Sequence, residues 1–70
     1  MKVVSIEIKI NSYEEEMLVN NLSGSFSFAP TSKYKTYGYQ VINYKVSRLD
    51  VRKLKEFWLG IFEDCRICTY

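Results

Sequence analysis

Two cysteines make the most recognisable chemical spacing in this chain. Cys65 and Cys68 form a Cys-x-x-Cys pair, and two thiolates at this spacing can bind one tetrahedral zinc ion. The chain has no histidine and no third cysteine, so zinc would need the cysteine pairs of two subunits to form one site. A redox role needs a thiolate stabilised by a helix N-terminus, whereas this pair follows a predicted helix C-terminus. We expect no metal and no other cofactor, with intersubunit zinc as the alternative.

The other reactive side chains do not combine into a catalytic site. Glu14, Glu15 and Glu16 are consecutive, and on a helix successive side chains diverge by about 100°, so their carboxylates do not converge on one atom. The serines have no histidine to act as their base. The three glycines are scattered and form no phosphate-binding loop. We predict that the chain is not an enzyme.

The middle of the chain combines aromatic and basic residues. Residues 33–48 contain four basic residues and no acid, whereas the acidic residues Glu14–Glu16 give the first third a negative balance. The chain has eleven aromatic residues, six of them Tyr, which is more than one small core encloses. Exposed Tyr and Arg side chains dominate many protein interfaces. We therefore predict a partner-binding surface made by Lys33, Tyr34, Lys35, Tyr37, Tyr39, Lys45, Arg48 and Arg52.

Two classes of partner suit this segment. A host protein or nucleoprotein complex would be bound mainly through the tyrosines. Single-stranded nucleic acid is the alternative, because bases stack on aromatic rings while lysines follow the phosphates. The net charge is only +2, and no ribonucleoprotein signature of the RNA recognition modules is present. A homodimer, formed by an exposed edge strand or by apposed cysteine pairs, is compatible with both.

The first third of the chain predicts a strand followed by a short helix. Residues 3–10 alternate between apolar and polar side chains, which indicates a half-buried strand with Val4, Ile6, Ile8 and Ile10 on one face. Residues 12–22 are ambiguous. Ser12 and Glu15 have the spacing of a capping box and Gly24 could end a helix, but alternation also permits a strand. We favour the helix.

The central third predicts two further strands. Phe26 and Phe28 alternate with serines, which indicates a short strand over residues 25–29 that ends at Pro30. Residues 31–35 are polar and predict a loop. Residues 36–46 predict a strand that is partly apolar on both faces. Either a bulge near Gly38 to Gln40 switches the faces of the strand, or the strand is central and covered on both sides.

The last third contains the clearest helix. Ser47 and Asp50 have the spacing of a second capping box, and apolar residues follow with helical period at Val51, Leu54, Phe57, Trp58, Ile61 and Phe62. Residues 65–70 predict a short edge strand. The chain thus predicts one α+β domain over residues 1–70. Its sheet has three or four mostly antiparallel strands, with the amphipathic helix of about residues 48–63, and the short helix of residues 12–22 if it forms, on one face.

No segment predicts a signal peptide or a membrane span, because the apolar runs are short and charged residues interrupt them. We expect a cytoplasmic protein that does not enter membranes and keeps its cysteines reduced.

The chain resembles the small proteins that bacteriophages encode against host machinery. The resemblance lies in its size, its high content of Lys, Asn, Ile and Tyr, and its lack of a catalytic motif. The anti-CRISPR proteins are the best-known group. Many of them are strongly acidic DNA mimics, whereas this chain is weakly basic. The resemblance therefore implies a non-enzymatic inhibitor that sterically blocks a protein or nucleoprotein complex in the cytoplasm of a host cell.

Overall fold

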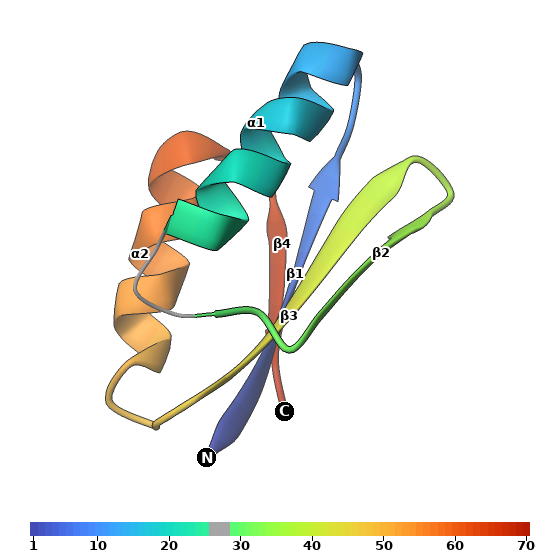
Figure 1. The fold of residues 1–70 in the computed structure, drawn as a ribbon. Helices are drawn as coiled ribbons and strands as arrows, with labels where there is room; N and C mark the ends of the chain where they lie inside the picture. The colour runs from blue at the N-terminus through green and yellow to red at the C-terminus, as the bar shows by residue number, and fades with distance from the viewer. Residues whose placement is uncertain (26–28) are drawn as a thin grey trace.

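The computed structural model describes residues 1–25 and 29–70. Its elements follow the order β1 (Lys2–Lys9), α1 (Tyr13–Ser25), β2 (Ser32–Thr36), β3 (Tyr39–Val46), α2 (Val51–Ile61) and β4 (Arg66–Thr69). The strands form one antiparallel sheet in the order β2-β3-β1-β4. Both helices lie on the same side of this sheet (Figure 1). The predicted α+β class and the predicted strand and edge position of residues 65–70 are confirmed.

Each helix connects two strands that run in the same direction and have a third strand between them. The β1-α1-β2 unit encloses β3, and the β3-α2-β4 unit encloses β1. This interleaving is the split β-α-β arrangement. It puts β1 and β3 at the centre of the sheet and leaves β2 and β4 as its two edges.

The hydrophobic core lies between the sheet and the helices. In the register of the central strands, Ile6 lies opposite Ile42 and Val4 opposite Tyr44. All four side chains are fully buried, which confirms the predicted apolar face of residues 3–10. The core cluster comprises Val4, Ile6, Ile8, Val19, Ile42, Tyr44, Val46, Leu54 and Trp58.

A hairpin replaces the loop predicted at residues 31–35. That prediction is wrong, because Ser32–Thr36 is strand β2. This edge strand has no buried residue, so its composition is as polar as that of a loop. Tyr37 and Gly38 connect it to β3 with φ values of 48° and 81°. Positive φ at both central residues is typical of the type I′ turn. Gly38 therefore marks a turn and not the bulge that we considered.

The helix expected at residues 12–22 is confirmed and extends to Ser25. Ser12 Oγ accepts a hydrogen bond of 3.2 Å from the Glu15 N–H, and Glu15 Oε2 accepts one of 3.2 Å from the Asn11 N–H. These bonds satisfy backbone donors at the helix start. Gly24 lies inside the helix, and the three glutamates of its first turn suit the positive end of the helix dipole.

The second helix is shorter than the predicted range of residues 48–63. It runs from Val51 to Ile61 with Asp50 as its N-cap, and no side chain caps a backbone N–H at this helix start. The capping box predicted at Ser47 and Asp50 is therefore wrong, because Ser47 Oγ instead donates a hydrogen bond of 2.8 Å to Asp50 Oδ2 in the turn before the helix. Leu54 and Trp58 are buried as the periodicity predicts, whereas Ile61 of the same predicted stripe is 40% exposed. In the described residues, neither helix is long and apolar enough to cross a membrane.

The strand predicted over residues 25–29 falls largely outside the described residues. Its first residue, Ser25, ends α1 and its last, Ala29, lies outside any strand. Phe26 and Phe28, which we expected on the core side of that strand, are not among the described residues.

Candidate binding surface

The sheet has one face that no described element covers. Strand alternation and register assign to it the odd-numbered residues of β1 and β3 and the even-numbered residues of β2 and β4. We call this the open face. Its cross-strand rows are Lys9-Tyr39-Thr36, Arg66-Glu7-Val41-Tyr34 and Cys68-Ser5-Asn43-Ser32, with Tyr70-Val3-Lys45 at the end near the termini.

Three tyrosines are the largest side chains of the open face. Tyr34, Tyr39 and Tyr70 are 52%, 39% and 72% exposed. Val41 lies between the first two, opposite Tyr34 and two residues from Tyr39, and is only 3% exposed. Cross-strand neighbours have Cβ atoms about 5 Å apart, so the surrounding long side chains cover Val41 without a helix. One buried valine thus lies next to both Tyr34 and Tyr39 on this face.

The charges of the open face are mostly positive. Lys9, Lys45 and Arg66 oppose a single carboxylate, that of Glu7, which lies directly opposite Arg66 in the register. Lys9 lies directly opposite Tyr39, and Lys45 lies opposite Val3. The cations thus occupy both ends of the sheet and the β4 edge, around the tyrosines.

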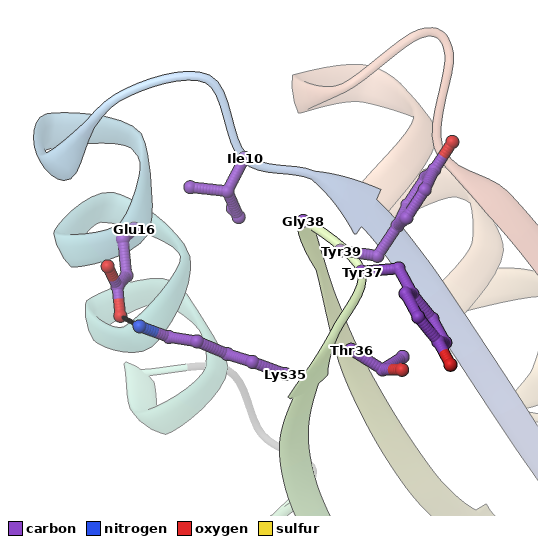
Figure 2. A pocket seen from close by; sticks show the side chains of 7 residues that line it. All are labelled: Ile10, Glu16, Lys35, Thr36, Tyr37, Gly38 and Tyr39. Atoms are coloured by element: carbon purple, nitrogen blue, oxygen red, sulfur yellow. Dashed lines mark ion pairs between the residues drawn. The ribbon is translucent and has the colours of Figure 1, made fainter.

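Tyr37 extends this surface at the tip of the hairpin. It is 98% exposed, and Figure 2 shows its ring and that of Tyr39 projecting away from α1. Lys35 and Ile10 instead point towards α1. The hairpin tip therefore presents two aromatic rings on one side and aliphatic and charged groups on the other.

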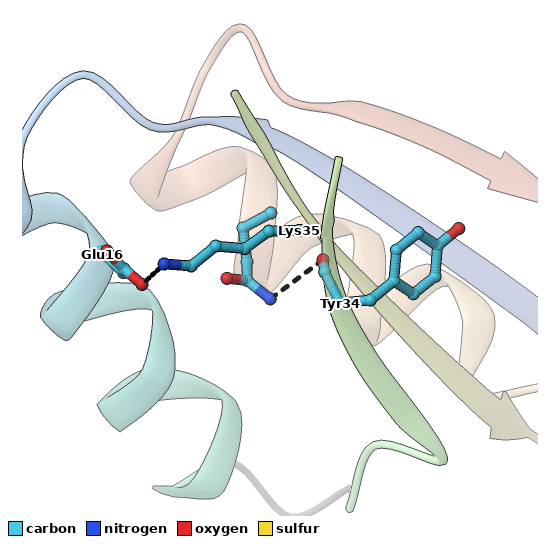
Figure 3. A network of polar contacts seen from close by, with 4 residues as sticks. Glu16, Tyr34 and Lys35 are labelled. Carbon is cyan, nitrogen blue, oxygen red and sulfur yellow. Dashed lines mark hydrogen bonds and ion pairs between the residues drawn. The ribbon is translucent and has the colours of Figure 1, made fainter. Parts of the chain in front are cut away.

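The structure separates the lysines of β2 from the neighbouring tyrosine. Lys33 and Lys35 belong to the helix side of the sheet, whereas Tyr34 belongs to the open face. Lys35 Nζ forms an ion pair with Glu16 Oε1 of α1, and the Tyr34 carbonyl accepts a hydrogen bond of 3.3 Å from Gln40 Nε2 (Figure 3). The lysines expected beside the tyrosines thus lie on the other side of the sheet, where Lys35 joins the hairpin to α1.

The two predicted arginines also lie away from the open face. Arg48 is exposed in the turn before α2. Arg52 lies on α2, where its Nε donates a hydrogen bond of 3.1 Å to Glu56 Oε1. Of the eight residues predicted as one surface, Tyr34, Tyr39 and Lys45 share the open face, with Tyr37 at its tip.

A pocket of about 250 Å³ lies between α1 and the hairpin tip. The Glu16–Lys35 ion pair lines one wall, and the remaining lining residues are Ile10 and the hairpin residues Thr36, Tyr37, Gly38 and Tyr39 (Figure 2). Small-molecule sites usually exceed about 300 Å³. The three glutamates at the start of α1 do not converge here, because Glu15 bonds to Asn11 and Glu16 to Lys35.

The cysteines lie on opposite sides of the sheet. Cys65 packs against the hydrophobic core, while Cys68 lies opposite Ser5 on the open face. Three residues of extended chain span about 10 Å, so the two thiols cannot share one ion or form a disulfide with each other. In the described part of the chain, no group of three or more His, Cys, Asp or Glu residues could hold a metal ion.

Sequence reasoning missed the contribution of the other strands to this surface. Lys9 belongs to the polar face of the strand predicted over residues 3–10, but its position beside Tyr39 depends on the register of β1 with β3. Arg66 and Tyr70 join the surface only because β4 pairs with β1. No protein-family model matches this chain, and no curated protein or solved structure resembles it significantly.

Proposed function

We propose that this domain is a non-enzymatic binding protein that recognises another protein through its open face. The observation that carries the proposal is the grouping of Tyr34, Tyr39 and Tyr70, all partly exposed, on a sheet face that no described element covers. Tyrosine combines a large apolar ring with a hydroxyl and loses little conformational entropy on binding, and it is enriched among the residues that dominate interface energies.

The charges of the open face indicate the chemistry of the partner. Three cations surround the tyrosines, and Glu7 is the one carboxylate among the described residues of this face. A complementary surface would have an apolar centre, which receives the rings, and acidic groups at its rim. A domain that covers such a surface would block other molecules from it. The proposed action is therefore steric inhibition of a host protein or nucleoprotein complex in the cytoplasm.

Single-stranded nucleic acid is the second candidate. The observation that favours it is the architecture, because RNA recognition modules stack bases on aromatic residues across the face of a four-stranded sheet. Tyr39 beside Lys9 offers a ring and a phosphate-binding cation as direct neighbours. We rank it second because Lys33 and Lys35 lie on the other side of the sheet and because Glu7 lies in the middle of the row between Tyr34 and Arg66.

Removal of two rings tests the proposal. The Tyr34→Ala/Tyr70→Ala double variant should weaken partner binding by about 30-fold or more, as expected when dominant interface residues are truncated. Its free energy of unfolding should change by about 1 kcal/mol or less, since both side chains are largely exposed. The measurement is capture from nuclease-treated host lysate, followed by titration of the captured protein in purified form.

The control is Tyr13→Ala, which removes from α1 a ring about as exposed as that of Tyr70 (70% against 72%). It should bind as the wild type does. If the control and the double variant lose binding equally, or if neither loses it, the open face is not the binding surface. Binding of a fluorescent thymidine oligonucleotide that weakens steeply with salt and requires the same tyrosines would instead establish the second candidate.

A further inference from the structure

The outer edge of β4 presents unpaired backbone groups. Val3 and Tyr70 exchange two backbone hydrogen bonds, of 3.3 and 2.8 Å. In an antiparallel ladder such pairs alternate with pairs that make no bond. Cys68 and Arg66 therefore bond to β1, whereas the N–H and C=O groups of Ile67 and Thr69 point away from the sheet. No described residue bonds to these outward groups.

The two edges of the sheet differ in charge. The opposite edge, β2, has lysines at its second and fourth positions, Lys33 and Lys35. Any two-fold pairing of β2 with itself about one of its three central residues would put lysine opposite lysine, which is destabilising. The β4 edge has the single charge of Arg66 at its first position. Only this edge is compatible with a second copy of the same strand.

We propose that two copies of this chain pair antiparallel through β4, about a two-fold axis at Cys68. This inference does not rest on the proposed function. In this register the outward groups of Ile67 bond to those of Thr69 of the second copy, and the same bonds recur by symmetry. Arg66 then lies opposite Tyr70 of the second copy, a favourable neighbour for a cation. This register pairs β4 over its full length and places no two like charges opposite each other.

Such pairing extends the sheet to eight strands. Because the two-fold axis is perpendicular to the sheet, all four helices lie on one side and both open faces lie on the other. The dimer therefore presents the tyrosines of both copies on one continuous surface. Since only five residues of each chain pair, dimerisation should depend strongly on concentration.

Cys68 reports on this register directly. Its backbone bonds point towards β1, so across the dimer axis it faces Cys68 of the second copy as a non-hydrogen-bonded pair, with Cα atoms about 4.5 Å apart. This separation lies within the range of disulfides. Cys65 is three residues from the axis and on the helix side, so the two Cys65 thiols would be about 20 Å apart.

The first experiment is sedimentation velocity over a concentration series. The Thr69→Pro variant removes an outward N–H without touching a bond to β1, and proline is tolerated at such edge positions. Its dimer dissociation constant should rise about tenfold or more, since one hydrogen bond is lost at each of two symmetric positions. The matched control, Thr69→Val, retains the N–H and should dimerise like the wild type.

The second experiment tests whether the two Cys68 thiols face each other in the dimer. Diamide oxidises two thiols to a disulfide and takes up their two electrons and two protons. It should crosslink the wild type and Cys65→Ser into dimers, but not Cys68→Ser. A chain that stays monomeric at every concentration, a dimer unaffected by Thr69→Pro, or a crosslink that requires Cys65 would each overturn the proposal.

Discussion

Cys65 differs from Cys68 in its surroundings, although the two residues belong to one motif. Burial against the core raises the pKa of the Cys65 thiol, and the neighbouring Asp64 carboxylate raises it further. Both effects disfavour the thiolate, which is the nucleophilic form. Cys65 should therefore react more slowly at neutral pH in the folded chain than in the unfolded chain.

The raised pKa predicts how folding shifts the pH dependence of Cys65 labelling. In the Cys68→Ser background, the midpoint of the rise in iodoacetamide labelling with pH should be higher for the folded chain than for the urea-unfolded chain. Asp64→Asn should lower the folded midpoint, because it removes the carboxylate. Mass spectrometry of timed samples gives the rates. Equal midpoints in the folded and unfolded chains would contradict the assigned surroundings.

At the scale of elements, the β2–β3 hairpin is formed at a local cost. Tyr37 has a φ of 48°, a left-handed conformation that costs residues other than Gly, Asn and Asp about 1–2 kcal/mol. Its ring is 98% exposed and gains little from packing. An Asn-Gly pair is the preferred sequence for this turn. The tyrosine is thus a poor turn residue at the tip of the proposed binding surface.

The Tyr37→Asn variant should therefore stabilise the domain. We expect the free energy of unfolding in urea to rise by about 1 kcal/mol, because asparagine adopts the left-handed conformation more readily. Gly38→Ala is the opposite control and should lower stability by about 1 kcal/mol, since its φ is 81°. If Tyr37→Asn destabilises the chain, the turn assignment is wrong.

At the scale of the whole molecule, Tyr44 and Trp58 connect the sheet to α2. Both side chains are fully buried, and Trp58 also packs edge-on against Phe57 and stacked with Phe62, at centroid distances of 5.4 and 6.2 Å. Among the described residues, neither Tyr44 Oη nor Trp58 Nε1 has a hydrogen-bond partner of good geometry. Burial raises the pKa of the Tyr44 phenol. The indole N–H of Trp58 lowers it by a smaller amount, because a hydrogen-bond donor near the phenol oxygen favours the phenolate.

The raised pKa makes global stability sensitive to alkali. The folded chain holds the Tyr44 proton to higher pH than the unfolded chain does, so stability falls as pH rises through the ordinary tyrosine value of 10.0. Tyr44→Phe should lose less stability in that range and differ from the wild type at neutral pH by about 1 kcal/mol or less. Urea unfolding at several pH values measures both quantities.

The control for this prediction is Tyr13→Phe, whose ring is 70% exposed. It should retain the alkaline loss of the wild type. If both phenylalanine variants lose stability equally with pH, Tyr44 is not the group responsible.

Local periodicity in the sequence was enough to predict the elements that carry the core. The alternation of residues 3–10 predicted the buried face of β1, and the helical spacing from Val51 to Phe62 predicted the buried Leu54 and Trp58 of α2, because backbone geometry sets both periods. The capping pair at Ser12 predicted the start of α1. β2 was misread as a loop, since an exposed edge strand has no apolar face to reveal its alternation.

The candidate surface, in contrast, depended on pairing between distant segments. The sequence excluded histidine chemistry and predicted that several tyrosines would be exposed, and five of the six are. It grouped Tyr34 with Lys33 and Lys35 because they are adjacent in the chain. The fold separates these neighbours, since successive residues of a strand point to opposite faces. It brings Lys9, Arg66 and Tyr70 to the tyrosines instead, because strand order and register are set by packing of the whole core and not by local sequence.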